Sequence, residues 1–567
     1  MGGNFAGLAA LRELQRCWKK SHEKEITVLR IVLIDKRGYS EYTPGILRLF
    51  CDPGHFFQLA QALPERTSDD GGDGNGDGYG CCSFERIQGT VTSIVKEDPA
   101  ETTEIKNPAG QMQKVLTYVP TLDDNPSDHT INNNITDNNH CGAQAAVAIT
   151  PATKNLRYDY LILATGATYT EPISPATPKD AGSSIPWTTT TTMRGRKKEW
   201  QNVHERLKGA NRVLILGAGA VGVELAAEIL DHNNTSSRTA VTIVDARPTL
   251  VPLFPRSAGA YTEDWLTRRG AELLLGESLR SWNDRSCTMA NGTVVHADVV
   301  YVCFGNRPNS EMVTGSSESK SNSNSNNNTR LFSLTRRRNV IVNDTLQLVV
   351  NNDTDNDGDG NGYSETPWFA CGDVASPPTN DEKQAFQAEM QGKLAARNVI
   401  KLLESSSSWS PRATSANINQ DNKQNLLRYP SDIAGADRIP LVYVLSLGRY
   451  DGVLGFNDFC IPGPLAAIVK WILEHTKVSQ MRGRLFGNLI WKIGDAVTLF
   501  LSRTLFRSPS PSAAVSSTST TRSKPMDSSH DRSAAISSFS SLASPHHTPA
   551  THQRHQYRES DDQLKLA

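Results

Sequence analysis

One cysteine pattern is missing from this chain of 567 residues. It contains nine cysteines but no C-x-x-C pair, which excludes a zinc site or a redox-active dithiol built on that spacing. We therefore expect no metal site. The odd number and irregular spacing of the cysteines favour a reducing compartment, so we expect an intracellular protein of the cytoplasm or mitochondrion.

A large net charge and a long apolar run are missing as well. Lys and Arg number 59 and Asp and Glu number 60, so no overall field favours nucleic acid as a partner. No run reaches the roughly 18 apolar residues that predict a membrane-spanning helix. No apolar segment typical of a secretory signal opens the chain.

Polar inserts interrupt the chain and a polar tail ends it. They are rich in Asp, Asn, Ser, Thr or Gly and poor in apolar residues, and they lie at 66–80, 122–144, 314–329, 351–364, 404–424 and 508–567. Segments of this composition do not bury enough apolar surface to offset the entropy lost on ordering. We expect long disordered inserts and a disordered tail.

Between the inserts, apolar runs alternate with helix-forming segments. An alternating segment, 84–95, predicts a strand that pairs at a sheet, and apolar runs predict strands at 27–34, 158–166, 240–244 and 298–304. Continuous apolar runs of this kind are typical of parallel strands buried on both faces. The pattern predicts an α/β fold.

One glycine motif stands directly behind the apolar run 213–216. Its glycines are Gly217, Gly219 and Gly222, and Asp245 ends the next predicted strand. Glycines at this spacing let a pyrophosphate approach a helix amino terminus, and the acid binds the adenosine ribose. The motif predicts an NADH site, with NADPH possible because Arg247 lies nearby.

A second, damaged copy opens the chain. It has Gly2, Gly3 and Gly7, but Asn4 stands where the middle glycine belongs. Asp35 follows at the place of the ribose-binding acid. A buried strand normally precedes such a loop, so we expect that the first strand is missing from this sequence and that a misplaced start codon is the cause.

The order of these motifs resembles a known group of enzymes. The series continues with Ala164-Thr165-Gly166, Gly305-x-x-Pro308-Asn309 and Phe369-Ala-Cys-Gly372-Asp373. Together the motifs resemble the FAD- and NAD(P)-binding pyridine nucleotide oxidoreductases with two dinucleotide domains. The likeness is strongest to the group of apoptosis-inducing factor and ferroptosis suppressor protein, which is related to the type II NADH dehydrogenases.

The resemblance implies two Rossmann-like domains, the FAD domain being interrupted by the NAD domain, and a carboxy-terminal region with an amphipathic helix. The expected FAD domain covers 1–172 and 347–430, and the NAD(P)H domain covers 195–346. The carboxy-terminal domain covers 438–507, and the tail 508–567 is disordered.

The resemblance also implies roles for individual residues. FAD would be bound by Gly2, Gly3, Gly7, Asp35, Arg48, Val91, Thr165, Gly166, Gly372 and Asp373. Asp373 would stand at the start of a helix that faces the flavin. NADH would be bound by Gly217, Gly219, Gly222, Asp245 and Gly305. Glu224 beside the nicotinamide and Lys383 near the flavin ring would be the catalytic residues.

The electron acceptor is predicted from an absence. Disulfide reductases of this fold carry a cysteine pair after the second strand, and only Cys51 lies there. Electrons would then pass from the flavin directly to a quinone. Two alternatives remain: a single-cysteine peroxidase or persulfide reductase that uses Cys51, and a redox-sensing scaffold flavoprotein or incomplete gene model.

The segment after Leu485 predicts a basic amphipathic helix. Apolar residues such as Phe486, Ile493 and Val497 recur at helical spacing among arginines and lysines. Such a helix either lies in a membrane surface or packs on its own domain. We expect peripheral membrane contact as one possibility, and the sequence does not predict the oligomeric state.

Overall fold

The structure is a computed structural model that describes twelve segments of the chain. They are residues 1–21, 28–67, 82–96, 114–121, 153–170, 172–175, 191–232, 239–313, 332–351, 363–379, 382–407 and 426–505. Apart from a few flanking residues, the five polar inserts and the tail predicted to be disordered lie outside the described residues.

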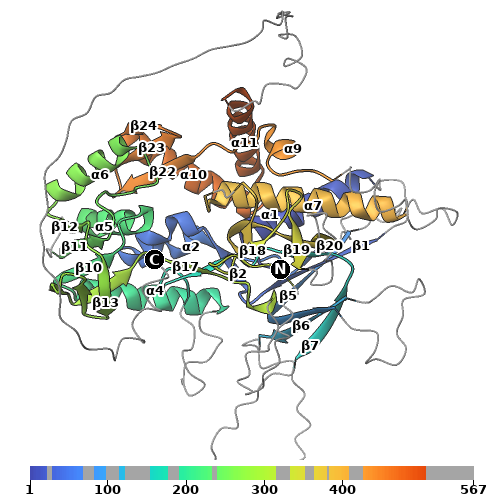
Figure 1. Cartoon of the computed structure of the whole chain (residues 1–567), viewed down its shortest axis with the longest axis horizontal. Helices are drawn as coiled ribbons and strands as arrows, with labels where there is room; N and C mark the ends of the chain where they lie inside the picture. The colour runs from blue at the N-terminus through green and yellow to red at the C-terminus, as the bar shows by residue number, and fades with distance from the viewer. Residues whose placement is uncertain are drawn as a thin grey trace, which may run out of the picture.

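The amino-terminal part of the chain forms a mixed sheet (Figure 1). Its strands, in the order β1–β5–β6–β7 with β4 beside β5, are β1 (Leu29–Asp35), β4 (Arg66–Thr67), β5 (Cys82–Lys96), β6 (Lys114–Pro120) and β7 (Lys154–Tyr158). β1 and β5 are parallel, whereas β6 is antiparallel to both β5 and β7. The predicted strands 27–34 and 84–95 are therefore confirmed.

A smaller sheet completes this region and changes one predicted strand. It consists of β19 (Gln347–Asn351), β20 (Tyr363–Ala370) and β8 (Leu161–Leu163), in that order. The predicted strand 158–166 is present but shorter, as β8, and Tyr158 is instead the last residue of β7. β7 pairs with β6 and β8 pairs with β20, so the chain bends at Asp159 to serve two sheets.

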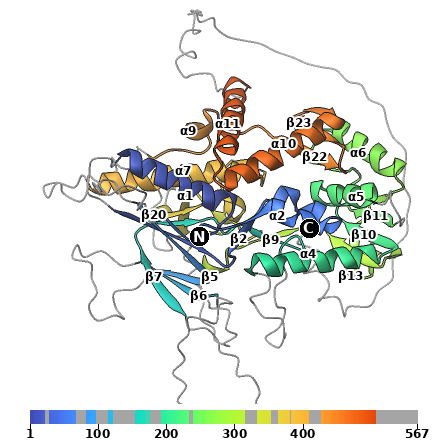
Figure 2. The ribbon, with the colours of Figure 1, turned by 180° about the vertical axis from the view of Figure 1, so that it is seen from behind.

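Two long helices cover the strands of these sheets. α1 (Phe5–Ser21) and α7 (Ala385–Ser407) pack against each other, and they run side by side in Figures 1 and 2. Short elements fill the connections: η4 (Glu311–Val313), β18 (Val340–Ile341), η5 (Gly372–Val374), β21 (Ala375–Ser376) and α9 (Ser431–Ala434).

The second α/β unit is a parallel sheet in the order β12–β11–β10–β16. Its strands are β10 (Arg212–Leu216), β11 (Ala240–Asp245), β12 (Glu272–Leu275) and β16 (Val299–Val302). Its helices are α4 (Met193–Lys208), α5 (Ala220–His232) and α6 (Arg256–Arg268), and the meander β13 (Leu279–Asn283), β14 (Ser286–Met289) and β15 (Val294–His296) lies beside it. The central strand β10 is buried from Val213 to Leu216, as its apolar run predicts.

Two short antiparallel strands connect the α/β units. β9 (Ala167–Tyr169) leaves the first unit and β17 (Asn306–Pro308) returns from the second. The segment after β1 packs across both units and comprises β2 (Tyr39–Glu41), η1 (Thr43–Phe50), η2 (Pro53–His55), α2 (Phe56–Leu59) and β3 (Ala60–Ala62). One apolar cluster joins η1, α5 and β22, so these elements share a core.

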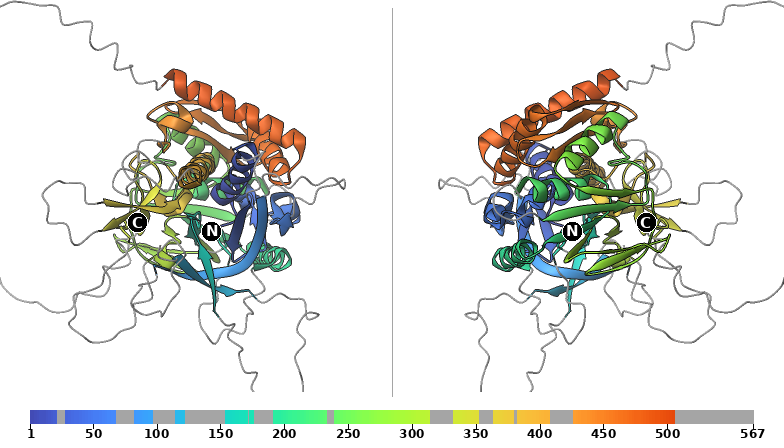
Figure 3. Two further views of the ribbon diagram at one scale, coloured as in Figure 1. Left: turned by 90° about the vertical axis from the view of Figure 1, so that its right-hand side faces the viewer. Right: turned by 90° about the vertical axis from the view of Figure 1, so that its left-hand side faces the viewer.

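The carboxy-terminal region adds a meander and two helices. They are β22 (Val442–Leu447), β23 (Asp451–Phe456), β24 (Phe459–Pro462), α10 (Pro464–Met481) and α11 (Leu485–Leu505). α10 and α11 pack against each other, and they lie along one edge of the molecule in Figure 3. The helix predicted after Leu485 is confirmed as α11.

Candidate functional site

The first glycine motif forms a tight turn that precedes α1 and lies against the carboxyl end of β1. The Gly2 amide donates to the carbonyl oxygen of Ile34 at 2.9 Å, and the Gly3 amide donates to Oδ2 of Asp35 at 2.6 Å. Gly2 has a φ of +99°, which residues with a Cβ rarely adopt. Asp35 thus fastens the turn to the end of β1.

The second motif repeats these bonds. The Gly217 amide donates to the carbonyl oxygen of Val244 at 2.8 Å, and the Ala218 amide donates to Oδ2 of Asp245 at 2.7 Å. Gly217 has a φ of +112°. The two turns therefore have one geometry, although their sequences differ.

The last glycine of each motif lets a helix close onto its own loop. A Cβ added at Gly7 would overlap the carbonyl oxygen of Gly2, and a Cβ added at Gly222 would overlap that of Gly217. In contrast, no atom lies within 4 Å of a Cβ built on Gly219. Both helices thus begin in a turn that leaves first-turn N–H groups for a bound anion.

Met1 lies between two strand ends. Its amino group donates to the Ile162 carbonyl at 2.7 Å, and its carbonyl accepts from the Ala164 amide at 2.8 Å. The equivalent residue in the second unit is Leu216, whose carbonyl accepts from the Cys303 amide at 2.7 Å. The amino-terminal loop is therefore anchored in its sheet like the second one.

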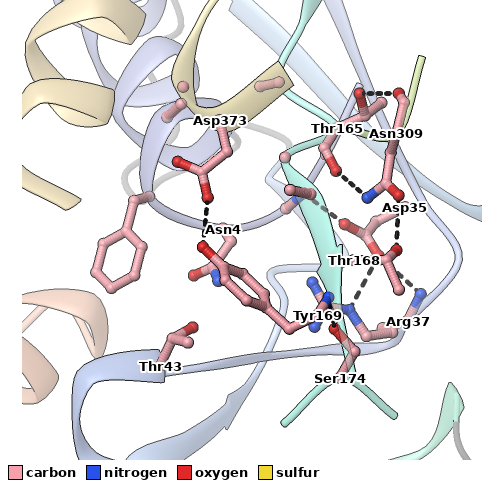
Figure 4. Close-up of a pocket in the computed structure, with 18 of the residues that line it drawn as sticks. Asn4, Asp35, Arg37, Thr43, Thr165, Thr168, Tyr169, Ser174, Asn309 and Asp373 are labelled. Atoms are coloured by element: carbon pink, nitrogen blue, oxygen red, sulfur yellow. Dashed lines mark hydrogen bonds and ion pairs between the residues drawn. The ribbon is translucent and has the colours of Figure 1, made fainter. Parts of the chain in front are cut away.

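A cavity of about 630 Å³ adjoins the first loop (Figure 4). The predicted site residues that line it are Gly2, Gly3, Asp35, Val91, Thr165, Gly166, Glu224, Gly372, Asp373 and Lys383. They come from segments far apart in the sequence, and only Glu224 belongs to the second α/β unit. The cavity therefore lies where the two units meet.

The other predicted residues do not line this cavity. Gly7 packs behind the first loop, and Gly217, Gly219, Gly222, Asp245 and Gly305 belong to the second α/β unit. Arg48 faces elsewhere, with its Nε 3.8 Å from Oε1 of Glu228. The structure thus gives no support to Arg48 as a cofactor-binding residue.

The carboxylate of the second loop is held by an arginine. Arg247 donates to Asp245 through its backbone amide at 2.8 Å and through its side chain at 3.1 Å. Burial alone would raise the pKa of Asp245, but the hydrogen bonds from Arg247 and from the Ala218 amide lower it. The acid therefore stays ionised, as recognition of a ribose hydroxyl requires.

Asp373 and Tyr169 meet in the cavity wall (Figure 4). The Tyr169 hydroxyl donates to Oδ2 of Asp373 at 3.2 Å, and burial raises the pKa of Asp373. Lys383 donates its Nζ to the carbonyl oxygen of Ala375. Asp373 stands in the short turn η5 rather than at the start of a long helix, since α7 begins only at Ala385.

The two crossover strands are joined by a side-chain network. The Thr165 hydroxyl donates to the Asn309 carbonyl at 2.7 Å, and the Asn309 side-chain amide donates to the Thr165 carbonyl at 2.8 Å. The Thr168 hydroxyl donates to Oδ1 of Asn309, also at 2.7 Å. Our sequence analysis included Thr165 but missed Thr168 and Tyr169, although they follow Gly166 directly.

Glu224 makes its contacts with the carboxy-terminal region. Its Oε1 accepts hydrogen bonds from the Ser446 amide at 2.8 Å and from the Ser446 hydroxyl at 3.0 Å. It also lies 2.5 Å from Nζ of Lys470, which is on α10. Our sequence analysis gave neither partner a role beside Glu224, because both follow it by more than 200 residues.

Cys51 does not have the features of a reactive thiol. It is buried and does not line the cavity. Burial raises the pKa of its thiol far above the usual range, and thiolates, not thiols, are the nucleophiles. Cys371 does line the cavity, but burial raises its pKa to about 12.

The residues around the first loop fit an FAD molecule. The loop has the glycine cradle in which a Cβ would overlap the backbone, and the side-chain oxygen of Asn4 in the cavity wall is buried without a partner among the described residues. Such orphaned polar atoms indicate a missing ligand group. The twelve described segments contain no cluster of acidic, histidine or cysteine side chains suited to a metal ion. None of their helices is long and apolar enough to cross a membrane.

Comparisons with known proteins agree with this geometry. A family model described as pyridine nucleotide-disulphide oxidoreductase matches residues 1–329. Ferroptosis suppressor protein 1 of Xenopus laevis is 25% identical over 334 residues, which cover 56% of this chain and 69% of that protein. The chain spans about 40% of the length of most other curated relatives that it matches.

Two solved structures share the fold. The sulfide:quinone oxidoreductase of Aquifex aeolicus has a TM-score of 0.51 and 16% identity, over 91% of this chain and 93% of that one. NDH2 of Plasmodium falciparum has a TM-score of 0.51 and 12% identity, over 89% of this chain and 96% of that one. These likenesses bear out the α/β fold with Rossmann-like units.

Proposed function

The chain belongs to the pyridine nucleotide-disulphide oxidoreductase family, whose members use FAD and NAD(P)H, and we propose that it transfers electrons from NADH to a quinone. The overall reaction is NADH + H⁺ + quinone → NAD⁺ + quinol. Bound FAD supplies the redox chemistry by accepting a hydride from NADH and passing two electrons on.

The chain's own residues bind and orient the two nucleotides in this proposal. Gly2, Gly3 and Asp35 hold the FAD pyrophosphate and ribose at the amino terminus of α1. Gly219 and Asp245 do the same for NADH at α5. Glu224 lies at the cavity wall on α5, beside the place where the nicotinamide would meet the flavin ring.

The observation that carries the quinone assignment is the two-sided character of α10. One side reaches inward, where Lys470 pairs with the cavity residue Glu224. The other side exposes Leu465, Ile468 and Trp471, each about half exposed. The helix that contacts the cavity wall thus also carries an exposed apolar surface. A quinone that dissolves in lipid needs such a surface near the flavin.

α11 extends this apolar surface. Its exposed apolar side chains recur at three- and four-residue spacing and are Leu485, Phe486, Leu489, Ile493, Val497 and Phe500. Groups of exposed apolar side chains mark contacts with partners or membranes. Arg482, Arg484 and Lys492 are also exposed on this hairpin and complement anionic lipid head groups. We propose peripheral contact with a membrane surface through α10 and α11.

NADH is the proposed reductant because Asp245 stays ionised and would repel a 2′-phosphate. Arg247 donates its side chain to that carboxylate and partly neutralises it, and the side chain is 47% exposed, so a 2′-phosphate can reach it. We therefore propose NADPH as a secondary substrate. The persulfide-reductase and peroxidase alternatives both need a reactive Cys51, which its burial and raised pKa disfavour.

Steady-state turnover of the full chain tests the proposal. The purified protein should contain one FAD, NADH should bleach the flavin absorbance under anaerobic conditions, and added quinone should restore it. NADPH is assayed in place of NADH for comparison. Hydrogen peroxide and a persulfide are assayed in place of the quinone. Flavin that stays reduced in the presence of every quinone would overturn the quinone assignment. Fast turnover of NADH with a quinone would exclude a redox-sensing scaffold flavoprotein.

A further inference from the structure

Asn4 is a polar residue at a position where the second loop has a glycine. The equivalent residue of the second loop is Gly219, because both follow the amide that is bound by the strand-end aspartate. The hydrogen bonds of the two turns are otherwise the same. A side chain has therefore been added to a loop that keeps its geometry.

The Asn4 side chain does not cap its helix. The Asn4 carbonyl accepts the first helical hydrogen bond, from the Leu8 amide at 2.8 Å, which makes Asn4 the residue that precedes α1. An Asn at this position normally accepts a hydrogen bond from an amide of the first turn. Here its Oδ1 is buried and has no partner among the described residues.

The side chain instead belongs to the cavity. Asn4 lines it together with Tyr169, Asp373 and Thr43 (Figure 4). Asp373 already accepts the Tyr169 hydroxyl, so this pair is no donor to Oδ1. A buried amide without a partner costs free energy, and the cost is recovered only when a ligand group bonds to it.

We propose that the Asn4 side-chain amide is a binding residue for the pyrophosphate of FAD, an inference that rests on the proposed FAD site. Turning the amide by 180° about its last bond places Nδ2 where Oδ1 lies, and an amide N–H then donates to a phosphate oxygen. Phosphate groups accept hydrogen bonds, and the amino terminus of α1 favours their charge. The side chain thus adds a donor where Gly219 offers only open space.

Three substitutions separate this role from a merely tolerated side chain. Asn4→Asp keeps the size and removes the donor, Asn4→Gly restores the glycine of the second loop, and Asn202→Gly is the control. Asn202 is exposed on α4 and does not line the cavity. The measured quantity is the Kd of FAD for the apoprotein, from quenching of flavin fluorescence.

A hydrogen bond to a charged group sets the expected size of the effect. Asn4→Gly should weaken FAD binding about tenfold, and Asn4→Asp should weaken it further because a carboxylate repels the pyrophosphate. Asn202→Gly should leave the Kd unchanged. FAD binding by Asn4→Gly or Asn4→Asp as tight as in the parent protein would overturn the proposal.

Two further measurements test whether the variants fold and whether the parent protein binds FAD. Circular dichroism and the Kd of NADH, which depends on the intact second loop, show whether each variant is folded. If the parent protein itself bound no FAD, the proposed function would fail. If the parent bound FAD and the Asn4 variants bound it equally well, only the role of Asn4 would be lost.

Discussion

The Gly3 amide and the Asp35 carboxylate lie 2.6 Å apart, and the Ala218 amide and Asp245 repeat the bond at 2.7 Å. One chain thus holds two loops that are fixed by the same hydrogen bond, and we propose that each loop binds a different nucleotide. The Asp35→Asn and Asp245→Asn variants keep the size of the side chain but lose its charge.

We expect the two variants to separate the cofactors. Asp35→Asn should release FAD during purification, because a neutral amide fixes the loop and ribose less well. Asp245→Asn should keep its FAD but show a higher KM for NADH and a smaller preference over NADPH. Flavin content and KM measure the two effects, and loss of FAD from both variants would contradict separate sites.

Two glycines of the second loop differ in whether they have room for a side chain. Gly222→Ala places a Cβ against the Gly217 carbonyl, whereas Gly219→Ala meets no atom within 4 Å. We expect Gly222→Ala to lower the melting temperature. Gly219→Ala should melt normally and bind NADH about as tightly as the parent, because Asn4 shows that this loop position accommodates a Cβ. Differential scanning fluorimetry and NADH titration check both results, and equal melting temperatures would count against the packing argument.

These loops show what the sequence predicts well. Local patterns with a steric cause, such as the glycines of Gly217–Gly222 behind a buried strand, predict a turn, a strand and a helix together. The damaged copy at Gly2–Gly7 was predicted only through its place in the series of motifs. In the structure, the Asp35 bond identifies it directly.

Other features depend on contacts that no local pattern reveals. The segment 158–166 has one apolar pattern, but Tyr158 ends β7 and pairs with β6, whereas only Leu161–Leu163 form β8 and pair with β20. Asp373 is not followed by a helix, since Ala375 and Ser376 pair with β18 and two prolines follow. Lys470 reaches Glu224 because α10 and α5 both pack against β22.

Cys51 provides a test of the alternative acceptors. Its side chain is buried in the core cluster around η1, and its thiol stays protonated at neutral pH because burial raises its pKa. Cys51→Ser should leave quinone turnover within about twofold of the parent, and it should cost about 1 kcal/mol of stability by burying a hydroxyl. Turnover and urea unfolding measure the two effects, and an inactive but folded variant would favour the cysteine mechanism.

The exposed apolar face of α11 predicts that charged substitutions on it weaken membrane binding. Phe486 and Ile493 are 69% and 55% exposed, so a Glu at either position fits the fold but carries charge into the interface. The double variant Phe486→Glu/Ile493→Glu should lose cosedimentation with anionic vesicles and keep its NADH-dependent flavin reduction. Gln201→Glu adds a charge on α4, at the far edge from α11 in Figure 1, and should still bind. Equal vesicle binding by all three proteins would refute the membrane surface.

The ion pairs of Glu13 predict how the free energy of unfolding decreases in acid. It joins α1 to α7 by accepting hydrogen bonds from Arg397 at 2.6 Å and from Arg16 at 2.6 and 2.9 Å. Burial alone would raise its pKa, but the two arginines lower it from its usual value of 4.5 to about 2. Because the folded pKa is depressed, the ionised group stabilises the fold above pH 4.5, and this contribution disappears as the pH falls toward 2.

The Glu13→Gln variant isolates that contribution. The free energy of unfolding of the parent should decrease between pH 4.5 and 2 more steeply than that of the variant, which has no proton to bind there. Above pH 5 the variant should be the less stable protein, since two arginines lose a charged partner. Urea unfolding across this pH range measures both, with Glu263→Gln, exposed on α6, as the charge-matched control. Parallel pH profiles for the parent and Glu13→Gln would mean that Glu13 titrates normally and that the α1–α7 contact does not depend on its charge.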